Sequence, residues 1–144
     1  MSREYPERPI VGVGAVIVRD ARALLVRRAA EPLKGEWSIP GGVVELGETL
    51  RAACEREVRE ETGLIVRAGR VLEVFDRIVP GDAGRIRFHY VLVDFLCELI
   101  SGEARASSDA SELCWAAAGE LDRYRLSPPT LTVVRQGLEA AGHE

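Results

Sequence analysis

Runs of apolar residues predict the strands of this protein. From Val11 to Val18 the chain consists of Gly, Ala and branched aliphatic residues, and after a short polar break the apolar run resumes over residues 23–28. Two such runs predict a buried hairpin of two strands. Leu72–Val79 and Arg87–Leu99 are two further strand-like runs, and the Pro-Gly-Asp-Ala-Gly sequence of residues 80–84 predicts the turn between them.

Two segments have the pattern of helices. Leu50–Glu61 consists of good helix formers, Thr49 can cap its first turn, and Gly63 can end it. Near the C-terminus, two prolines precede Thr130–Ala140, in which apolar residues recur at helical spacing. Glu31–Gly47 carries too many glycines and prolines for a helix, so it is predicted to be a loop with short extended pieces.

The order of these elements predicts the class of fold. With a short strand around Leu113–Ala116, the order is strands, helix, strands, helix, with no internal repeat and no linker. Such an order predicts an α+β fold in which helices cover a mixed sheet. A length of 144 residues fits one domain. We expect this domain to span residues 10–142, after a flexible tail at residues 1–9.

Charge and hydropathy exclude two classes of partner. The 19 basic and 23 acidic residues give a net charge of −4, the wrong sign for a protein that neutralises nucleic-acid phosphates. The longest apolar stretch, Tyr90–Ile100, contains two acidic residues and is shorter than the roughly 20 residues of a membrane helix. The first nine residues lack the apolar segment of a secretory signal. We therefore expect a protein that binds neither nucleic acid nor membranes.

The cysteines indicate a compartment. Cys54, Cys97 and Cys114 are an odd number, have no metal-ligand spacing and lie in apolar segments. Such residues are typically buried, reduced thiols of a cytosolic protein. We therefore expect a cytoplasmic protein.

Three carboxylates share one face of the predicted helix. At about 100° per residue, Glu60 and Glu61 lie within about 60° of Glu57. The apolar residues of the helix fall on the same side: Leu50, Ala53, Cys54 and Val58. Like charges at this spacing repel, and a partly buried carboxylate needs a counter-charge. A hard divalent cation, Mg²⁺ or Mn²⁺, meets this need without His or Cys ligands.

The glycine-rich loop before this helix completes a known motif. Gly42, Glu48 and the run Arg56-Glu57-Val58-Arg59-Glu60-Glu61-Thr62-Gly63-Leu64 stand at the spacing of the 23-residue Nudix box. The chain therefore resembles the Nudix hydrolase family, and the pattern from Val11 to Trp115 is also similar to it. The resemblance implies an α/β/α sandwich with a mixed β-sheet, and a hydrolase that cleaves phosphate anhydrides.

The resemblance also implies which residues build the site. It assigns metal binding and catalysis to Glu57, Glu60 and Glu61, and it lets the carbonyl of Gly41 complete the metal shell. It assigns a scaffold role to four residues that hold the loop on the helix, two as an ion pair and two as glycines: Glu48 with Arg56, and Gly42 with Gly63.

The general base is left open between two places. In the family the base is a box glutamate in some members and a carboxylate on a later loop in others. Our first candidate is therefore Glu60. The second is the acidic segment before Trp115, where Asp109 or Glu112 can serve.

The substrate is predicted from residues outside the box. Arg28 resembles a family arginine that touches substrate phosphate, and Trp37 and Arg87 are further candidates for substrate binding. So few arginines favour a diphosphate over a triphosphate. Pro80, which lies 16 residues beyond Leu64, resembles a marker of ADP-ribose-hydrolysing members. We therefore expect conversion of ADP-ribose to AMP and ribose 5-phosphate.

Two alternatives stay open beside this expectation. One is a nucleoside triphosphate pyrophosphatase of the house-cleaning type, which removes oxidised nucleotides. The other is a non-catalytic Nudix domain that senses a nucleotide, although such a domain needs no set of three carboxylates and this chain keeps them all. The oligomeric state is also open, with a homodimer among the alternatives.

Overall fold

A computed structural model describes residues 3–29 and 33–142 of the chain. Its elements in chain order are β1 (Ile10–Arg19), β2 (Arg22–Arg28), β3 (Trp37–Ser38), β4 (Gly41–Val43), α1 (Leu50–Thr62), β5 (Ile65–Pro80), the 3₁₀ turn η1 (Asp82–Gly84), β6 (Ile86–Ser101), β7 (Ala110–Ala117), η2 (Ala118–Tyr124) and α2 (Pro128–Gly142). The predicted strands, turn and helices are all present. The loop expected from Glu31 begins with two residues that lie outside the described part.

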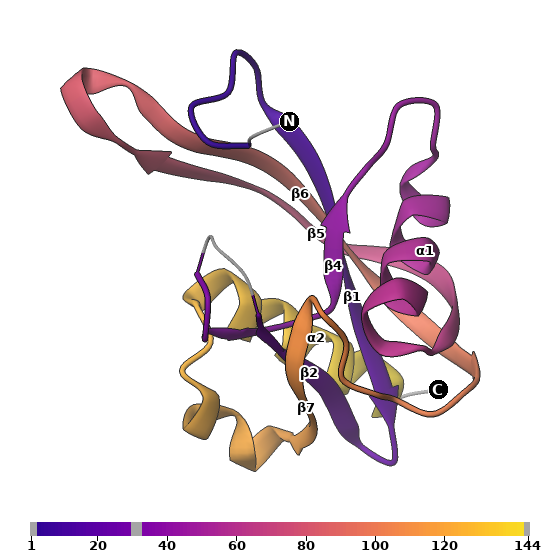
Figure 1. Ribbon diagram of the computed structural model, residues 1–144. Helices are drawn as coiled ribbons and strands as arrows, with labels where there is room; N and C mark the ends of the chain where they lie inside the picture. The colour runs from indigo at the N-terminus through magenta and orange to yellow at the C-terminus, as the bar shows by residue number, and fades with distance from the viewer. Residues whose placement is uncertain (1–2, 30–32, 143–144) are drawn as a thin grey trace.

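The strands form a mixed sheet in the order β3-β2-β1-β6-β5, to which β4 adds by pairing with β1 and β7 by pairing with β2 (Figure 1). The pairing of β1 with β6 is parallel, whereas β1 is antiparallel to β2 and β4. Strands β1 and β2 pair only near their turn, so β4 can occupy the same edge of β1 further along. The first residues of the box, which lie on β4, are therefore part of the sheet and pair with β1.

Helices α1 and α2 cover opposite faces of the sheet (Figure 1). Successive residues of a strand point to opposite faces. In β1, Ala15 and Ile17 accordingly belong to a core cluster with α1, whereas Val16 belongs to a second cluster with Val133 and Val134 of α2. The expected α/β/α layers are therefore confirmed.

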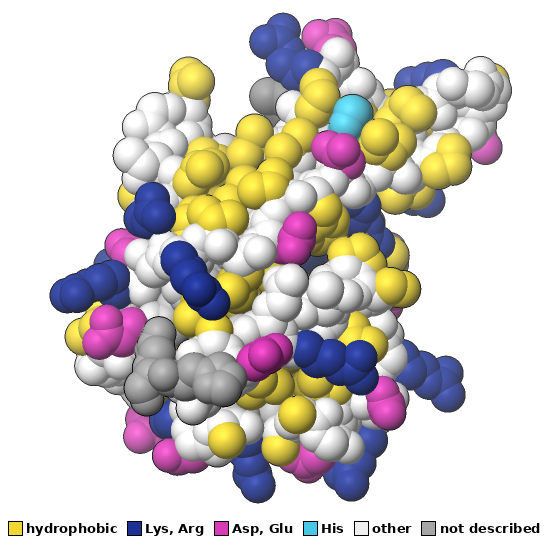
Figure 2. All heavy atoms as spheres, turned by 180° about the vertical axis from the view of Figure 1, so that it is seen from behind, with side chains coloured by type: hydrophobic (Ala, Val, Ile, Leu, Met, Phe, Trp, Pro, Cys, Tyr) yellow, Lys and Arg dark blue, Asp and Glu magenta, His cyan; other side chains and the backbone are white. Residues whose placement is uncertain are grey.

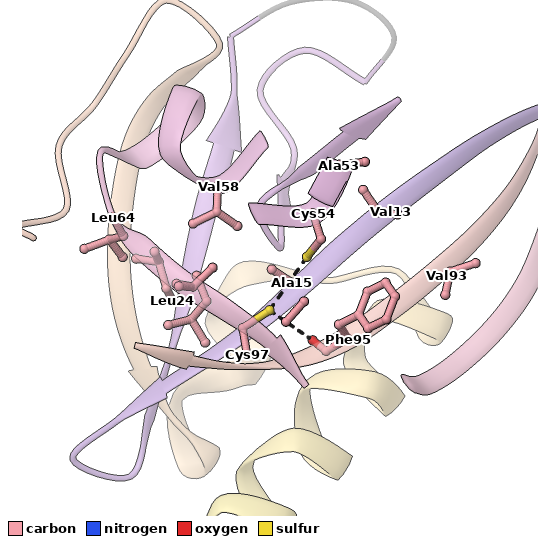
Figure 3. Close-up of a cluster of buried hydrophobic side chains, with 13 residues drawn as sticks. Val13, Ala15, Leu24, Ala53, Cys54, Val58, Leu64, Val93, Phe95 and Cys97 are labelled. Carbon is pink, nitrogen blue, oxygen red and sulfur yellow. Dashed lines mark hydrogen bonds between the residues drawn. The ribbon is translucent and has the colours of Figure 1, made fainter. Parts of the chain in front are cut away.

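The core under α1 contains two of the three cysteines (Figure 3). The Sγ atoms of Cys54 on α1 and Cys97 on β6 lie 3.7 Å apart, as thiols in contact and not as a disulfide. The pKa of the Cys97 thiol is raised, first by its contact with Cys54 and second by its burial. Both thiols are buried packing groups of the core.

The starts of two elements and the burial of one residue differ from the sequence-based expectation. Strand β5 begins at Ile65 and not at Leu72, because its first half pairs with the end of β6 in spite of its mixed polar pattern. Helix α2 begins at Pro128, since proline is tolerated in the first turn of a helix. Leu50, expected on the inner side of α1, is 38% exposed because it occupies the first turn, where the helix has little of the sheet to cover.

A long hairpin of β5 and β6 projects from the body of the molecule (Figure 1). The described part of the segment expected to be a tail, residues 3–9, contacts this hairpin. The backbone N–H of Tyr5 donates to the carbonyl of Arg87 at 2.7 Å, and the Arg85 guanidinium lies 4.0 Å from the Tyr5 ring centre. No helix in the described part of the chain is long and apolar enough to cross a membrane.

Candidate active site

The carboxylates on the inner face of α1, Glu57 and Glu61, lie against Gly41 and Gly42, the two glycines that begin β4. The Thr49 hydroxyl caps the helix by accepting the N–H of Ala52, and Gly63 ends it in the left-handed conformation. Near the end of the helix, Glu61 accepts the N–H of Gly41 at 3.0 Å. A side chain at Gly42 would collide with the carboxyl group of Glu57, so glycine is required there.

Glu61 lies in the least solvated part of the site. It is only 7% exposed, and this burial raises the pKa of its carboxyl group to about 7, against the lowering effect of the Gly41 N–H bond. The neighbouring carboxylate of Glu57 raises the pKa further. The charges of Arg28 and Asp109 also act on Glu61, the first lowering and the second raising its pKa. Residues from β2, from α1 and from the loop before β7 therefore converge on one carboxyl group.

Glu57 has an intermediate environment. Desolvation raises the pKa of its carboxyl group, and Arg56, whose Nη1 donates to Glu57 at 2.9 Å, opposes the rise. The charge of Arg3 also favours the ionised form of Glu57. The inner face of α1 thus carries two partly or largely buried carboxylates whose negative charge is only partly compensated.

Arg56 and Glu48 make the pair that the family resemblance implies for the scaffold. Arg56 Nε and Nη2 donate to the two carboxylate oxygens of Glu48 at 2.6 and 2.9 Å. The hydrogen bonds from Arg56 are the main reason that the pKa of Glu48 falls to about 2. Because Nη2 also donates to the carbonyl of Val43, the pair ties α1 to the end of β4.

The candidates for the general base lie in different surroundings. The side chain of Glu60 is 54% exposed and accepts a hydrogen bond from Arg56 at 3.2 Å. Asp109 lies beside the end of β2, where its carbonyl accepts the N–H of Ala29, and its charge acts on Glu61. Glu112, by contrast, forms an ion pair with Arg27 at 3.2 Å. Of these two carboxylates, only the charge of Asp109 is shown to act on a glutamate of the box, Glu61.

The donor set suits a hard cation, although the arrangement is not a closed metal cage. In the part of the chain that the structure describes, no group of three His, Cys, Asp or Glu side chains is gathered to hold a metal, and Glu60 is turned toward Arg56. Glu57 and Glu61 nevertheless present carboxylate oxygens, each with a pKa raised by its burial first and by neighbouring negative charge second. This pair fits Mg²⁺ or Mn²⁺, which bind through few carboxylates and several waters.

A cleft of about 600 Å³ runs along the other side of the two β4 glycines. Its walls come from β4, from the projecting hairpin, from the loop before β3 and from the start of α2. All three predicted substrate-binding residues line it: Arg28, Trp37 and Arg87. Trp37 also packs edge-on against Tyr124, with ring centres 5.1 Å apart, so it serves the core as well as the cleft.

The expectation of few cations near the substrate is wrong. Five basic residues line the cleft: Arg3, Arg28, Lys34, Arg77 and Arg87. Three of them escaped the sequence reasoning because they lie on an N-terminal segment, a loop and a strand that only the tertiary fold brings together. Two, Arg3 and Arg28, are close enough for their charges to act on the box carboxylates.

The cleft also contains an acidic residue that the sequence reasoning did not select. Asp94 on β6 lines the cleft and is 4% exposed. In the sequence, Asp94 is visible as a charged residue within the longest apolar run, and that charge indicated only that the run is not a membrane helix.

Comparisons with known proteins agree with this geometry. The family model of the NUDIX domain matches residues 8–136. The chain is 38% identical over 104 residues, 72% of its length, to an ADP-ribose pyrophosphatase of Methanocaldococcus jannaschii, and the match spans 59% of that protein. It is 42% identical over 110 residues, 76% of its length and 74% of the relative, to a Mycobacterium tuberculosis protein provisionally named 8-oxo-dGTP diphosphatase 2.

A solved structure extends the agreement to the fold. The MutT NUDIX hydrolase of Burkholderia pseudomallei superposes with a TM-score of 0.76 at 35% identity, covering 90% of this chain and 98% of that one. The chain belongs to the Nudix hydrolase family.

Proposed function

We propose that this Nudix hydrolase is a divalent-metal-dependent pyrophosphohydrolase that cleaves ADP-ribose to AMP and ribose 5-phosphate. One observation carries the proposal. Gly41 and Gly42 of β4 line the nucleotide-sized cleft, and the same two glycines contact the carboxyl groups of Glu61 and Glu57. A diphosphate lying in the cleft beside these glycines is therefore next to the carboxylates of the box.

The residues of the chain have distinct tasks in this reaction. Glu57 and Glu61 would hold the cation, which supplies charge neutralisation at the diphosphate and a water of lowered pKa. Arg3 and Arg28 bind phosphate oxygens. The water oxygen forms a bond to one phosphorus while the bridging P–O bond breaks, and a carboxylate takes the proton of the water. We propose Glu60 for this proton, with Asp109 and Glu112 as the alternatives.

The choice of ADP-ribose has two supports. The relative from M. jannaschii carries the name ADP-ribose pyrophosphatase. The basic residues of the cleft are also divided between its walls, with Arg28 and Lys34 on one side and Arg77 and Arg87 on the hairpin. A triphosphate concentrates its charge at one end, whereas this division suits a ligand with a central diphosphate and a sugar on each side.

A triphosphate substrate is the second candidate function. Five basic residues in the cleft can balance the additional charge, and the relative from M. tuberculosis is named for a triphosphate. A non-catalytic sensing role is less well supported, because a sensor does not need both Glu57 and Glu61 at the β4 glycines.

A substrate panel tests the proposal. Turnover of ADP-ribose, NADH, nucleotide sugars and oxidised triphosphates with Mg²⁺ is expected to give the highest kcat/KM for ADP-ribose. A kcat/KM for any triphosphate that exceeds it by about tenfold, or about 1.4 kcal/mol, contradicts the choice of substrate. Glu57→Gln and Glu61→Gln are expected to abolish most turnover of every substrate. If either variant keeps near-normal kcat at saturating Mg²⁺, that residue is not a metal ligand.

We also propose a cytoplasmic location. All three cysteines are free, and the Sγ atoms of Cys54 and Cys97 lie in contact without a bond, which favours a reducing compartment. When cells are lysed directly into denaturant that contains iodoacetamide, all three cysteines are expected to be alkylated, as reduced thiols are.

We propose a homodimer as the oligomeric state. Val74 and Ile78 on β5 are 54% and 52% exposed, and apolar side chains follow the projecting hairpin in Figure 2. Such surface is more stable when a second copy covers it. Light scattering after size exclusion is expected to give twice the mass of the chain, and Val74→Lys is expected to shift it toward one.

A further inference from the structure

Asp94 occupies the floor of the cleft at a defined distance from the box. The register of the sheet places Gly41 of β4, Gly14 of β1 and Asp94 of β6 in one row across three neighbouring strands. Two strand spacings, about 10 Å, therefore separate Asp94 from Gly41 beside Glu61. Because the other two members of the row are glycines, the row is a flat shelf with one functional side chain at its far end.

The absence of a side chain at Gly14 leaves room for the carboxyl group of Asp94. A Cβ atom on Gly14 would collide with Oδ1 of Asp94 and would lie 2.8 Å from Cδ1 of Ile39, so no larger residue fits there. The carboxyl group of Asp94 is thus held between β1 and apolar side chains of the cleft, among them Ile39 and Leu92. A flat aromatic ring fits between such apolar walls better than a sugar does.

No described residue donates a hydrogen bond to Asp94, although it is 4% exposed. Burial first, and then the charge of Glu73, raise the pKa of its carboxyl group to about 6. The buried carboxylates of the box differ, since Gly41 donates to Glu61 and Arg56 donates to Glu57. The carboxyl oxygens of Asp94 are not sealed from solvent and face the cleft, so a ligand bound there can supply the donor that the described part of the protein does not.

We propose that Asp94 determines base specificity: its carboxyl group accepts a hydrogen bond from the exocyclic amino group of a nucleobase bound in the cleft. The inference rests on the proposed function to the extent that the ligand is a nucleotide. In this arrangement the diphosphate of the nucleotide lies at Gly41 and the amino edge of its base reaches Asp94. The first sugar lies between them, over Gly14. Adenine, which has such an amino group, is selected over bases that lack one at this edge.

The test compares adenine with unsubstituted purine, which differs by the amino group alone. We expect kcat/KM for ADP-ribose to exceed that for the purine counterpart by more than about fivefold, since a buried hydrogen bond to a charged group contributes at least that much. Asp94→Leu, similar in size and without an acceptor, is expected to bring the ratio close to one. Asp94→Asn keeps an acceptor oxygen and is expected to restore most of the preference.

Controls keep the result specific. Asp76 also lines the cleft but is exposed, so Asp76→Leu is expected to retain the parent ratio. If Asp94→Leu does not fold, Asp94→Ala takes its place. A parent ratio below about fivefold, or a ratio that survives the loss of the Asp94 acceptor, overturns the proposal.

Binding separates this inference from the proposed function. Calorimetry with AMP and with purine riboside 5′-monophosphate measures the base contact without turnover. If the protein hydrolyses no ADP-ribose yet binds AMP more tightly in an Asp94-dependent way, the proposed reaction fails and the role of Asp94 stands. If ADP-ribose is hydrolysed without Asp94-dependent preference, the reaction stands and the role of Asp94 fails.

Discussion

At the scale of single residues, acidic groups on α1 and on the loop before it differ strongly in pKa. Arg56 contacts the carboxylates of Glu45, Glu48, Glu57 and Glu60, and its hydrogen bonds keep the pKa of Glu48 near 2. Glu61, one turn further along the inner face from Glu57, is largely buried, and this burial raises its pKa to about 7 in spite of the Gly41 N–H bond and the charge of Arg28. Separated pKa values let one group serve as fixed scaffold while its neighbour exchanges a proton or a metal near neutral pH.

The burial of Glu61 predicts a pH-dependent stability. Since its folded pKa of about 7 exceeds its ordinary value of 4.5, the folded state binds the proton more tightly, and the metal-free protein loses stability as pH rises from 4.5 to 7. Glu61→Gln removes this penalty and can still accept the Gly41 N–H bond. We expect the variant to be more stable by about 1–3 kcal/mol at pH 8 in EDTA, and equal to the parent at pH 4.5.

Urea unfolding at the two pH values measures this difference. Glu60→Gln, whose side chain is 54% exposed, is the matched control and is expected to show no such pH-dependent gain. A Glu61→Gln variant that is less stable than the parent at pH 8 contradicts the burial argument.

A second prediction at this scale concerns the base. If Glu60 takes the proton of the water, Glu60→Gln lowers kcat while the Mg²⁺ concentration at half-maximal rate changes little. Asp109→Asn is the informative comparison, because the charge of Asp109 reaches Glu61. Glu112→Gln is the control, since Glu112 is paired with Arg27. Should Asp109→Asn be the most damaging of the three, the base lies on the later loop.

At the scale of elements, strand β4 determines how the box meets the cleft. The strand has three residues, and its two glycines bring the backbone of the sheet against two carboxylates of α1. A side chain at Gly41 would collide with the carbonyl of Val13 on β1, and one at Gly42 would collide with Glu57. The close approach of α1 to β4 therefore depends on both positions lacking a Cβ atom.

Gly42→Ala tests this element. The added methyl group collides with the Glu57 carboxyl group, so Glu57 must move, and turnover is expected to fall by about 10- to 100-fold. The melting temperature is expected to change little, because the group displaced is the end of a side chain. Gly119→Ala, which meets nothing within 4 Å, is the control for kcat and for thermal unfolding. Unchanged kcat in Gly42→Ala means that the position of Glu57 is not critical.

At the scale of the whole molecule, the N-terminal segment connects the projecting hairpin with the cleft. Glu4 forms an ion pair with Arg87 at 2.8 Å, and Tyr5 packs against Gly81 near the tip of the hairpin. Arg3 and Arg87 both line the cleft. One wall of the substrate site is therefore supported by residues that are about 80 positions away in sequence.

Tyr5→Ala is expected to loosen this wall. Loss of the ring removes the contacts with Gly81 and Arg85, so amide exchange over residues 81–87 is expected to accelerate. Because Arg87 lines the cleft, KM is expected to rise while kcat changes little. Hydrogen exchange and steady-state kinetics measure the two effects. Glu7→Ala, an exposed residue of the same segment, is the control, and equal exchange in both variants means that Tyr5 does not support the hairpin.

The sequence by itself determined the elements whose signals are local. Thr49 and Gly63 mark the two ends of α1 because caps act on adjacent backbone groups, and the carboxylates of Glu57 and Glu61 share a face because helical spacing places them there. The Nudix box identified the family for the same reason, since its loop and helix are contiguous in the chain.

Only the tertiary structure decided what depends on distant segments. The first half of β5 alternates only over a few residues, around Val66 and Ala68, and it is a strand because β6 supplies its hydrogen bonds. The five basic residues of the cleft come from five separate segments of the chain, so the sequence alone did not reveal their number. Asp94 was visible only as a charge within an apolar run, because its role depends on Gly14 and Gly41 of neighbouring strands. Helical periodicity and capping act within a few residues, whereas a cleft is made by contacts between strands far apart in sequence.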